Sequence, residues 1–236
     1  MARELPAALP PERRTVGQLV AESIRAYGGA FWKVLPLGLP LAVADQAAGF
    51  FSIPGQVLVF VVALPLFVGG YAWACRVVLG APVTRAALVA GAAIWLPFPP
   101  LRAVYFLPGI AWLAFIGLAV PAAMVERLGF RAALERGRLL GTVDYVHALG
   151  SLAALVIVVG VSETTLQALL HTQGDNGKRL ALFLSDLVIS PLLFLGGALL
   201  YVDQAARTAV RSRPDADLHP PVDADAAGHP DPQVES

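Results

Sequence analysis

The sequence predicts an all-α, polytopic helical membrane protein with about six transmembrane helices and two amphipathic interfacial helices. Three observations lead to this prediction. Hydrophobic residues make up 57% of the 236-residue chain, charged residues only 14%, and mean hydropathy is +0.67. A soluble domain usually carries about 25% charged residues. The apolar residues also gather in long segments, and basic residues concentrate in alternate connections between those segments.

The apolar segments are the expected membrane spans. A helix needs about 20 predominantly apolar residues to cross the hydrocarbon core. Five segments meet this requirement: Val34–Ile53, Val57–Arg76, Val104–Met124, Leu149–Leu170 and Leu180–Val202. The segment Ala86–Phe98 is shorter and is followed by prolines, so a full crossing and a re-entrant segment both remain open.

The distribution of basic residues favours six crossings with both termini in the cytoplasm. In that arrangement only three of the 17 basic residues, Arg102, Lys178 and Arg179, lie outside. Five crossings would place the basic stretch Arg127–Arg138 outside, against the positive-inside rule. We therefore expect a protein integral to the bacterial plasma membrane, which is the inner membrane in bacteria that have two membranes.

The stretch between the third and fourth of these long segments has the pattern of an amphipathic helix. Apolar and small residues recur at helical spacing and define one face: Phe130, Ala133, Leu134, Gly137, Leu140 and Gly141. Such a basic helix would lie flat at the cytoplasmic interface, with Arg131, Arg136 and Arg138 as candidate contacts to lipid phosphates. The alternative is a solvated connector whose arginines only set the topology.

A second helix of this kind is expected near the N-terminus. Thr15 and Gln18 form a capping-box pattern. Glu22, Arg25 and Gly28 stand at the same relative spacing as Glu135, Arg138 and Gly141 in the central helix. This correspondence suggests an internal duplication. The expected organisation is a disordered N-terminus over residues 1–14, a helical membrane domain over 15–202 and a disordered cytoplasmic tail over 203–236.

The central stretch also resembles a known family. The resemblance is carried by Glu126, Gly129, Ala132-Ala133-Leu134, Arg136-Gly137-Arg138-Leu139 and Leu149-Gly150. These residues are similar to the membrane domain fused to some bacterial glycerophosphodiester phosphodiesterases, and to its stand-alone relatives of unknown function. The chain departs from that pattern at Glu135, where Arg is usual, and at Gly137, where Ser is usual. The resemblance implies an integral membrane domain without catalytic residues of its own.

Three carboxylates fall inside the expected spans: Asp45, Glu163 and Asp186. A carboxylate at the bilayer centre costs about 2.5–3.5 kcal/mol on insertion scales, so it usually has a role. We expect the three at similar depth, lining one polar cavity that binds a proton, a cation or a polar headgroup. The alternative is that they pair with basic residues or bond helices together and serve only assembly.

Several function classes lack support in the sequence. There is no H-E-x-x-H, G-x-S-x-G or Walker motif, so we expect no enzyme, and we expect no metal and no cofactor. Net charge is zero, which argues against a nucleic-acid partner. The expected partners are membrane lipids, with another membrane protein or a second copy as further candidates. We expect a non-catalytic lipid-associated or scaffolding protein; the alternative is a small transporter or flippase subunit using the intramembrane acids.

Overall fold

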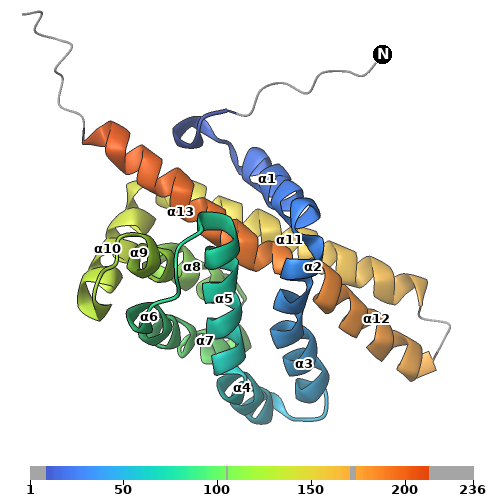
Figure 1. Ribbon diagram of the computed structural model, residues 1–236. Coiled ribbons are helices and arrows are strands. Elements are labelled where there is room, and N and C mark those ends of the chain that lie inside the picture. Colours follow the sequence, from blue (N-terminus) through green and yellow to red (C-terminus); the bar gives the residue numbers. More distant parts are fainter. Residues whose placement is uncertain (1–8, 105, 171–173, 213–236) are drawn as a thin grey trace, which may run out of the picture.

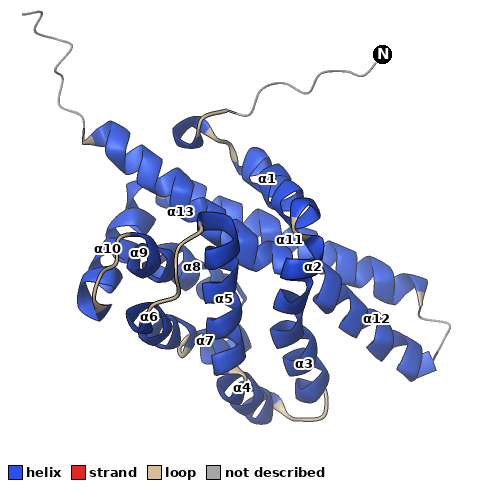
Figure 2. Cartoon of the chain, viewed as in Figure 1, coloured by secondary structure: helices blue, strands red, loops and turns tan. Residues whose placement is uncertain are grey.

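The computed structural model describes residues 9–104, 106–170 and 174–212, and this part of the chain is helical throughout, without strands (Figures 1 and 2). The N-terminal half contains η1 (Pro11–Arg13), α1 (Val16–Gly29), α2 (Phe31–Val34), η2 (Leu35–Gly38), α3 (Leu39–Ala48), α4 (Ile53–Val62), α5 (Leu64–Leu79) and α6 (Arg85–Trp95). The C-terminal half contains α7 (Phe98–Val104), α8 (Phe106–Ile116), α9 (Ala119–Val125), α10 (Phe130–Val143), α11 (Tyr145–Leu169), α12 (Gly174–Ile189) and α13 (Pro191–Arg211).

Three helical stretches in the described residues are long and apolar enough to cross a membrane: Leu107–Val125, Tyr145–Leu169 and Asn176–Arg211. The pair α4–α5, bent by 50°, makes a fourth if it is counted as one span. These helices are compatible with the predicted membrane protein. The predicted number of six crossings goes beyond what helix length and composition establish.

Prolines explain why the predicted spans are broken. The segment Val34–Ile53 divides into η2 and α3, and each has a proline, Pro36 or Pro40, in its first turn. The next span bends before α5, which again has a proline in its first turn. Proline lacks the N–H that would continue a preceding helix, so it is tolerated where a new helix starts.

α13 is the central element of the fold, and in Figure 1 it runs through the molecule between α1, α5 and α11. Its residues contribute to two groups of buried side chains. Phe194, Leu195 and Ala198 belong to the group formed with α5, α6 and α9, and Leu192 and Leu200 to the group formed with α1 and α11. The central place of α13 lets it form a wall for a site between these helices.

Helices form at both segments predicted to be amphipathic, but they pack differently. In α1 the capping box is confirmed: the Thr15 hydroxyl accepts from the Gln18 N–H, and the Gln18 side chain accepts from the Thr15 N–H at 2.9 Å. α1 packs against α13 and α11, whereas α10 packs against α9 and α8. The different partners do not confirm the predicted internal duplication.

The small-residue face of α10 is covered by protein. Ala133, Gly137, Leu140 and Gly141 are buried. A Cβ atom at Gly137 would lie 2.5 Å from the backbone nitrogen of Ala119, so the backbones of α10 and α9 are in contact here. These residues were correctly predicted to share one face of the helix, but that face was expected to contact lipid rather than protein. Their periodicity instead reflects packing inside the protein.

The predicted domain limits are wrong at both ends. α13 continues to Arg211, beyond the predicted limit at residue 202, and Asp203 and Gln204 are fully buried. Within the predicted disordered N-terminus, η1 packs against α13, and Arg14 pairs with Asp203. Buried ionic contacts order both segments. Residues 1–8 and 213–236 of the predicted disordered ends lie outside the described residues.

Candidate functional site

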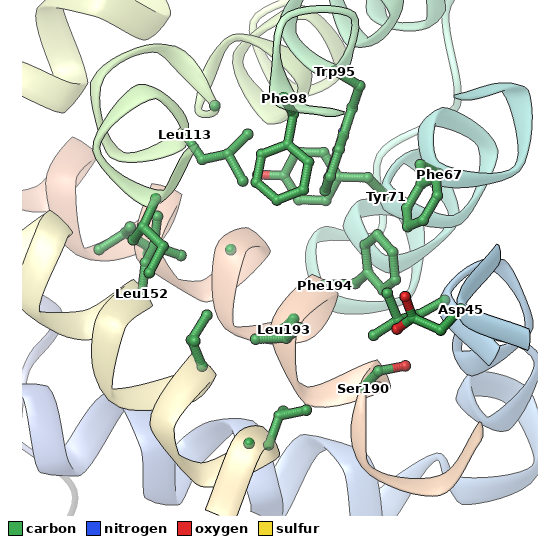
Figure 3. Close-up of a pocket in the computed structure, with 18 of the residues that line it drawn as sticks. Asp45, Phe67, Tyr71, Trp95, Phe98, Leu113, Leu152, Ser190, Leu193 and Phe194 are labelled. Carbon is green, nitrogen blue, oxygen red and sulfur yellow. The ribbon is translucent and has the colours of Figure 1, made fainter. Parts of the chain in front are cut away.

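A cavity of about 330 Å³ lies between helices from both halves of the chain (Figure 3). Its lining comes from α5, α6, α7, α8, α11 and α13 and from the helix breaks at Gly117, Leu118 and Ser190. Residues from these elements and from α3 line it: Leu41, Asp45, Phe67, Tyr71, Trp95, Phe98, Ile110, Leu113, Gly117, Leu118, Leu152, Val156, Val159, Gly160, Glu163, Ser190, Leu193, Phe194, Gly197 and Leu200. Most of them are apolar, as in typical small-molecule pockets.

Aromatic side chains support one wall of the cavity. Phe67 stacks on Trp95 with ring centroids 5.3 Å apart, and Phe194 lies 6.1 Å from Trp95. Tyr71 lies 6.5 Å from Phe194. These separations fall in the range of favourable ring–ring contacts. The rings hold one another in place, so this part of the cavity is pre-formed.

The two charged residues among those lining the cavity are both acidic. Asp45 comes from α3 and Glu163 from α11, and both are partly exposed. Ser190 lies at the break between α12 and α13, where its hydroxyl donates to the Asp186 carbonyl at 2.5 Å. Figure 3 shows Asp45 and Ser190 on one side of the cavity and Leu113 and Leu152 on the other. The cavity therefore has one acidic end and one apolar end.

The structure places Asp186 apart from the other two candidate acids. Asp186 is fully buried and is not among the residues that line the cavity. The Gln46 amide donates to the Arg179 carbonyl at 2.8 Å, which sets Arg179 of α12 beside the acidic end. Asp186 follows seven residues later in α12, which is about 10 Å further along the helix axis at 1.5 Å per residue. Asp45 and Glu163 therefore line the cavity and Asp186 does not, while the similar depth of the three acids in a membrane stays a prediction.

Two leucines at the apolar end of the cavity are buried, whereas Leu113 and Leu152 there are partly exposed. Leu118 and Leu200 form part of it and are 2% and 1% exposed. Both belong to the group of buried side chains that also contains Leu155 and Leu140.

The three candidate arginines of α10 have different environments. Arg136 donates to both carboxylate oxygens of Glu126, at 2.9 and 3.0 Å, and the Tyr201 hydroxyl donates to the same carboxylate at 3.0 Å. Arg131 and Arg138 lie on the exposed side of α10. Only these two present their guanidinium groups on the open face of the helix.

A buried polar cluster, which was not predicted above, joins the end of η1, the start of α11 and α13. Arg14 pairs with Asp203 at 2.5 Å, and the His147 ring nitrogen Nε2 lies 3.7 Å from the same carboxylate. Arg207 pairs with Asp144 at 2.6 Å, and the Gln204 amide donates to the Asp144 carbonyl.

A signal for this cluster was present in the sequence. Asp203, Arg207 and Arg211 recur four residues apart directly after a span, which is the spacing of one helix face. This spacing indicated that the last helix continues beyond residue 202.

Comparisons with known proteins add no relative: no protein-family model matches the chain, and neither the curated proteins nor the solved structures contain a match.

Proposed function

We propose that this chain is a non-catalytic integral membrane protein that holds a lipid-like molecule in the cavity between α11, α13, α5 and α8. The observation that carries the proposal is the lining of that cavity, which is apolar along its length and acidic at one end. A cavity enclosed by apolar helices receives its ligand from the bilayer more readily than from water. The resemblance to the membrane domain of phosphodiesterases is consistent with a role in lipid handling and remains a proposal.

The proposed topology has six crossings of a bacterial plasma membrane with both termini in the cytoplasm. The crossings would be α2–α3, α4–α5, α6–α7, α8–α9, α11 and α12–α13. Two groups of charged contacts support this assignment, because Arg14–Asp203 and Glu126–Arg136 both fall where the topology requires a cytoplasmic surface. Arginine at that surface agrees with the positive-inside rule.

We also propose that the open face of α10 contacts anionic lipid through Arg131 and Arg138. Both side chains are exposed. Leu139 and Phe130, at 51% and 37% exposure, add apolar surface to the same helix. Arginine is attracted to the anionic cytoplasmic leaflet, with about 1 kcal/mol per basic residue. Arg136 is left out of this proposal because it pairs with Glu126.

Transport is the second candidate function, because Asp45 and Glu163 line one cavity. Carboxylates inside membrane helices commonly mark substrate or ion pathways. Alternating access requires the site to open to each side in turn. Here Leu118 and Leu200 are buried beside the cavity, so transport would require the helices that carry them to move. Binding requires no such motion, and we therefore place it first.

A matched pair of glycine substitutions tests the binding proposal. A Cβ atom at Gly160 or at Gly69 would meet no atom within 4 Å. Gly160 lines the cavity, whereas Gly69 is exposed on α5. Replacing a helical glycine raises helix propensity equally at both positions. Gly160→Phe should therefore fill the cavity, while Gly69→Phe adds only apolar surface.

The readout is native mass spectrometry of the purified protein with its co-isolated lipids. The unchanged protein and Gly69→Phe should retain a bound lipid-like molecule, and Gly160→Phe should lose it. Equal retention in all three proteins would place the ligand outside the cavity. Absence of any retained molecule in all three would contradict the proposed function.

A further inference from the structure

We infer that the exposed surface between α2 and α5 binds the phosphate group of an anionic phospholipid. Two cationic residues, Lys33 of α2 and Arg76 of α5, would contact the phosphate, and two tryptophans, Trp32 and Trp73, flank them. All four residues are exposed, and none of them lines the cavity. The inference therefore concerns a second site and goes beyond the proposed function.

The Trp73 side chain links the two cationic residues. Its indole N–H donates to the Lys33 carbonyl at 3.1 Å, and the guanidinium carbon of Arg76 lies 5.5 Å from the centre of its ring. Pro36 lacks the N–H that a 3-10 turn would direct at the Lys33 carbonyl, so this carbonyl can accept from the indole. The Lys33 Cα then lies within about 6 Å of the indole nitrogen. Both cationic residues are thus attached to one aromatic side chain.

The two cations are not neutralised by acidic side chains. In the part of the chain that the structure describes, no carboxylate lies within ion-pair distance of Lys33 or Arg76. Glu22 of the preceding helix α1 pairs with Arg25 instead. An arginine that lies over an aromatic ring keeps N–H donors in its own plane, and a lysine ammonium has three donors. A phosphate group, with its negative charge and several acceptor oxygens, matches this set.

α5 runs antiparallel to the segment formed by η2 and α3. The bond from Trp73 to Lys33 fixes one point of this pairing. A Cβ atom at Gly70 would lie 3.9 Å from the Leu37 side chain, which fixes a second point one turn earlier in α5. Figure 1 shows α5 alongside α3, with α2 beside the C-terminal end of α5. The cations therefore lie at one end of a paired surface.

The paired surface continues from the cations as an apolar one. Leu39, six residues after Lys33, and Leu66, seven residues before Trp73, are both exposed. A phospholipid with its phosphate at the cations would lay its acyl chains over these leucines, whereas a soluble phosphate would leave them uncovered. Tryptophan is enriched at membrane–water interfaces, at the level of the lipid head groups. The ligand that fits both parts of this surface is an anionic phospholipid.

The test measures which lipid lies next to Trp73. A full-length protein that keeps Trp73 as its single tryptophan, with phenylalanine at the others, is placed in nanodiscs of phosphatidylcholine with a minor share of phosphatidylglycerol. Bromine quenches tryptophan fluorescence at short range. The acyl chains of either the phosphatidylglycerol or the phosphatidylcholine carry bromine, at the same lipid composition. Exchanging the label identifies the neighbouring lipid without changing the membrane.

Brominated phosphatidylglycerol should quench Trp73 well above its share of the lipid, and brominated phosphatidylcholine below its share. We expect a preference of about fivefold for each of the two cations. The joint change Lys33→Gln and Arg76→Gln should make quenching by each lipid proportional to its share. Arg131→Gln with Arg138→Gln removes the same charge from α10 and should leave the preference at Trp73 unchanged.

Proportional quenching by both lipids in the protein that keeps both cations would overturn the inference. An equal preference with and without Lys33→Gln and Arg76→Gln would overturn it too. A preference abolished by excess soluble glycerol phosphate would assign the surface to a soluble phosphate instead of a lipid. If the single-tryptophan protein does not fold, the same label exchange compares the unchanged protein with Trp73→Phe.

A cavity variant separates this inference from the proposed function. Gly160→Phe fills the cavity and should leave the lipid preference at Trp73 unchanged, because the cations lie outside the cavity. Loss of the preference in this variant would show that the quenching reports the cavity ligand, and the inference would fail.

Discussion

Arg14 and Asp203 form an ion pair across 189 positions of sequence, with 2.5 Å between Nη1 and Oδ1. The Asp203 side chain is fully buried, and that of Arg14 is 12% exposed. Arg207 holds the same region from the other side, because it donates to the Arg14 carbonyl at 2.8 Å and pairs with Asp144. The segment before α1 is thereby fixed to the C-terminal end of α13.

Arg14→Ala should destabilise the protein by about 3 kcal/mol or more, because it leaves the Asp203 carboxylate buried without its cation. The joint change Arg14→Met and Asp203→Leu should recover much of this loss, since it removes both charges. Thermal unfolding in detergent measures the effect. Arg25→Ala is the control: Arg25 pairs with Glu22 on the surface and is 61% exposed, so we expect little change. Equal effects at Arg14 and Arg25 would contradict a structural role for the buried pair.

Gly141→Ala should destabilise the packing of α10. A Cβ atom there would lie 2.3 Å from the Phe115 carbonyl oxygen, which is backbone and cannot turn aside. Overpacking of this kind costs about 1–3 kcal/mol. Gly17→Ala in α1 is the matched control, because nothing lies within 4 Å of the added atom. Melting temperatures of the two variants give the comparison, and a fully stable Gly141→Ala protein would show that α10 does not approach α8 this closely.

Substitutions of the arginines of α10 should affect either stability or lipid binding, depending on the arginine. Arg136→Gln should lower stability by about 1–2 kcal/mol, because it removes a two-point contact to Glu126, and should leave lipid contacts unchanged. Changing Arg131 and Arg138 to Gln should lower binding of anionic lipid to the purified protein and leave its melting temperature unchanged. Lipid retention and thermal unfolding of both variants check this. If only Arg136→Gln loses anionic lipid, then Arg136 contacts the lipid and Arg131 and Arg138 do not.

The helical class of the protein follows from its apolar segments, but the break points depend on particular residues. Pro36 and Pro40 divide the first predicted span, because each lies in the first turn of a new helix. The small-residue face of α10 was correctly grouped, yet periodicity alone does not distinguish a lipid cover from the backbone of α8 and α9. That distinction requires knowing which helices are neighbours.

The candidate site was predictable only in part, because the sequence does not show which helices are neighbours. Asp45 and Glu163 stand at similar distances from the ends of their predicted spans, Ile53 and Leu170, so counting residues predicted them at one level. Asp186 required the alignment of α12 with α3, which is set by contacts such as the one from Gln46 to Arg179. The aromatic wall gave no sequence signal, because Phe67, Trp95 and Phe194 are far apart in the chain and each reads as an ordinary membrane residue.

The most direct test of a ligand-binding cavity uses the same two glycines as cysteines. The native Cys75 is fully buried and should not react with thiol reagents. Labelling of Gly160→Cys by an uncharged alkyl thiosulfonate in nanodiscs should be slowed several-fold by the single-chain amphiphile decanol, because the alcohol occupies the cavity. Labelling of Gly69→Cys, on the exposed side of α5, should be unaffected. Unchanged labelling of Gly160→Cys in the presence of saturating decylamine, decanol and decanoate would contradict the account.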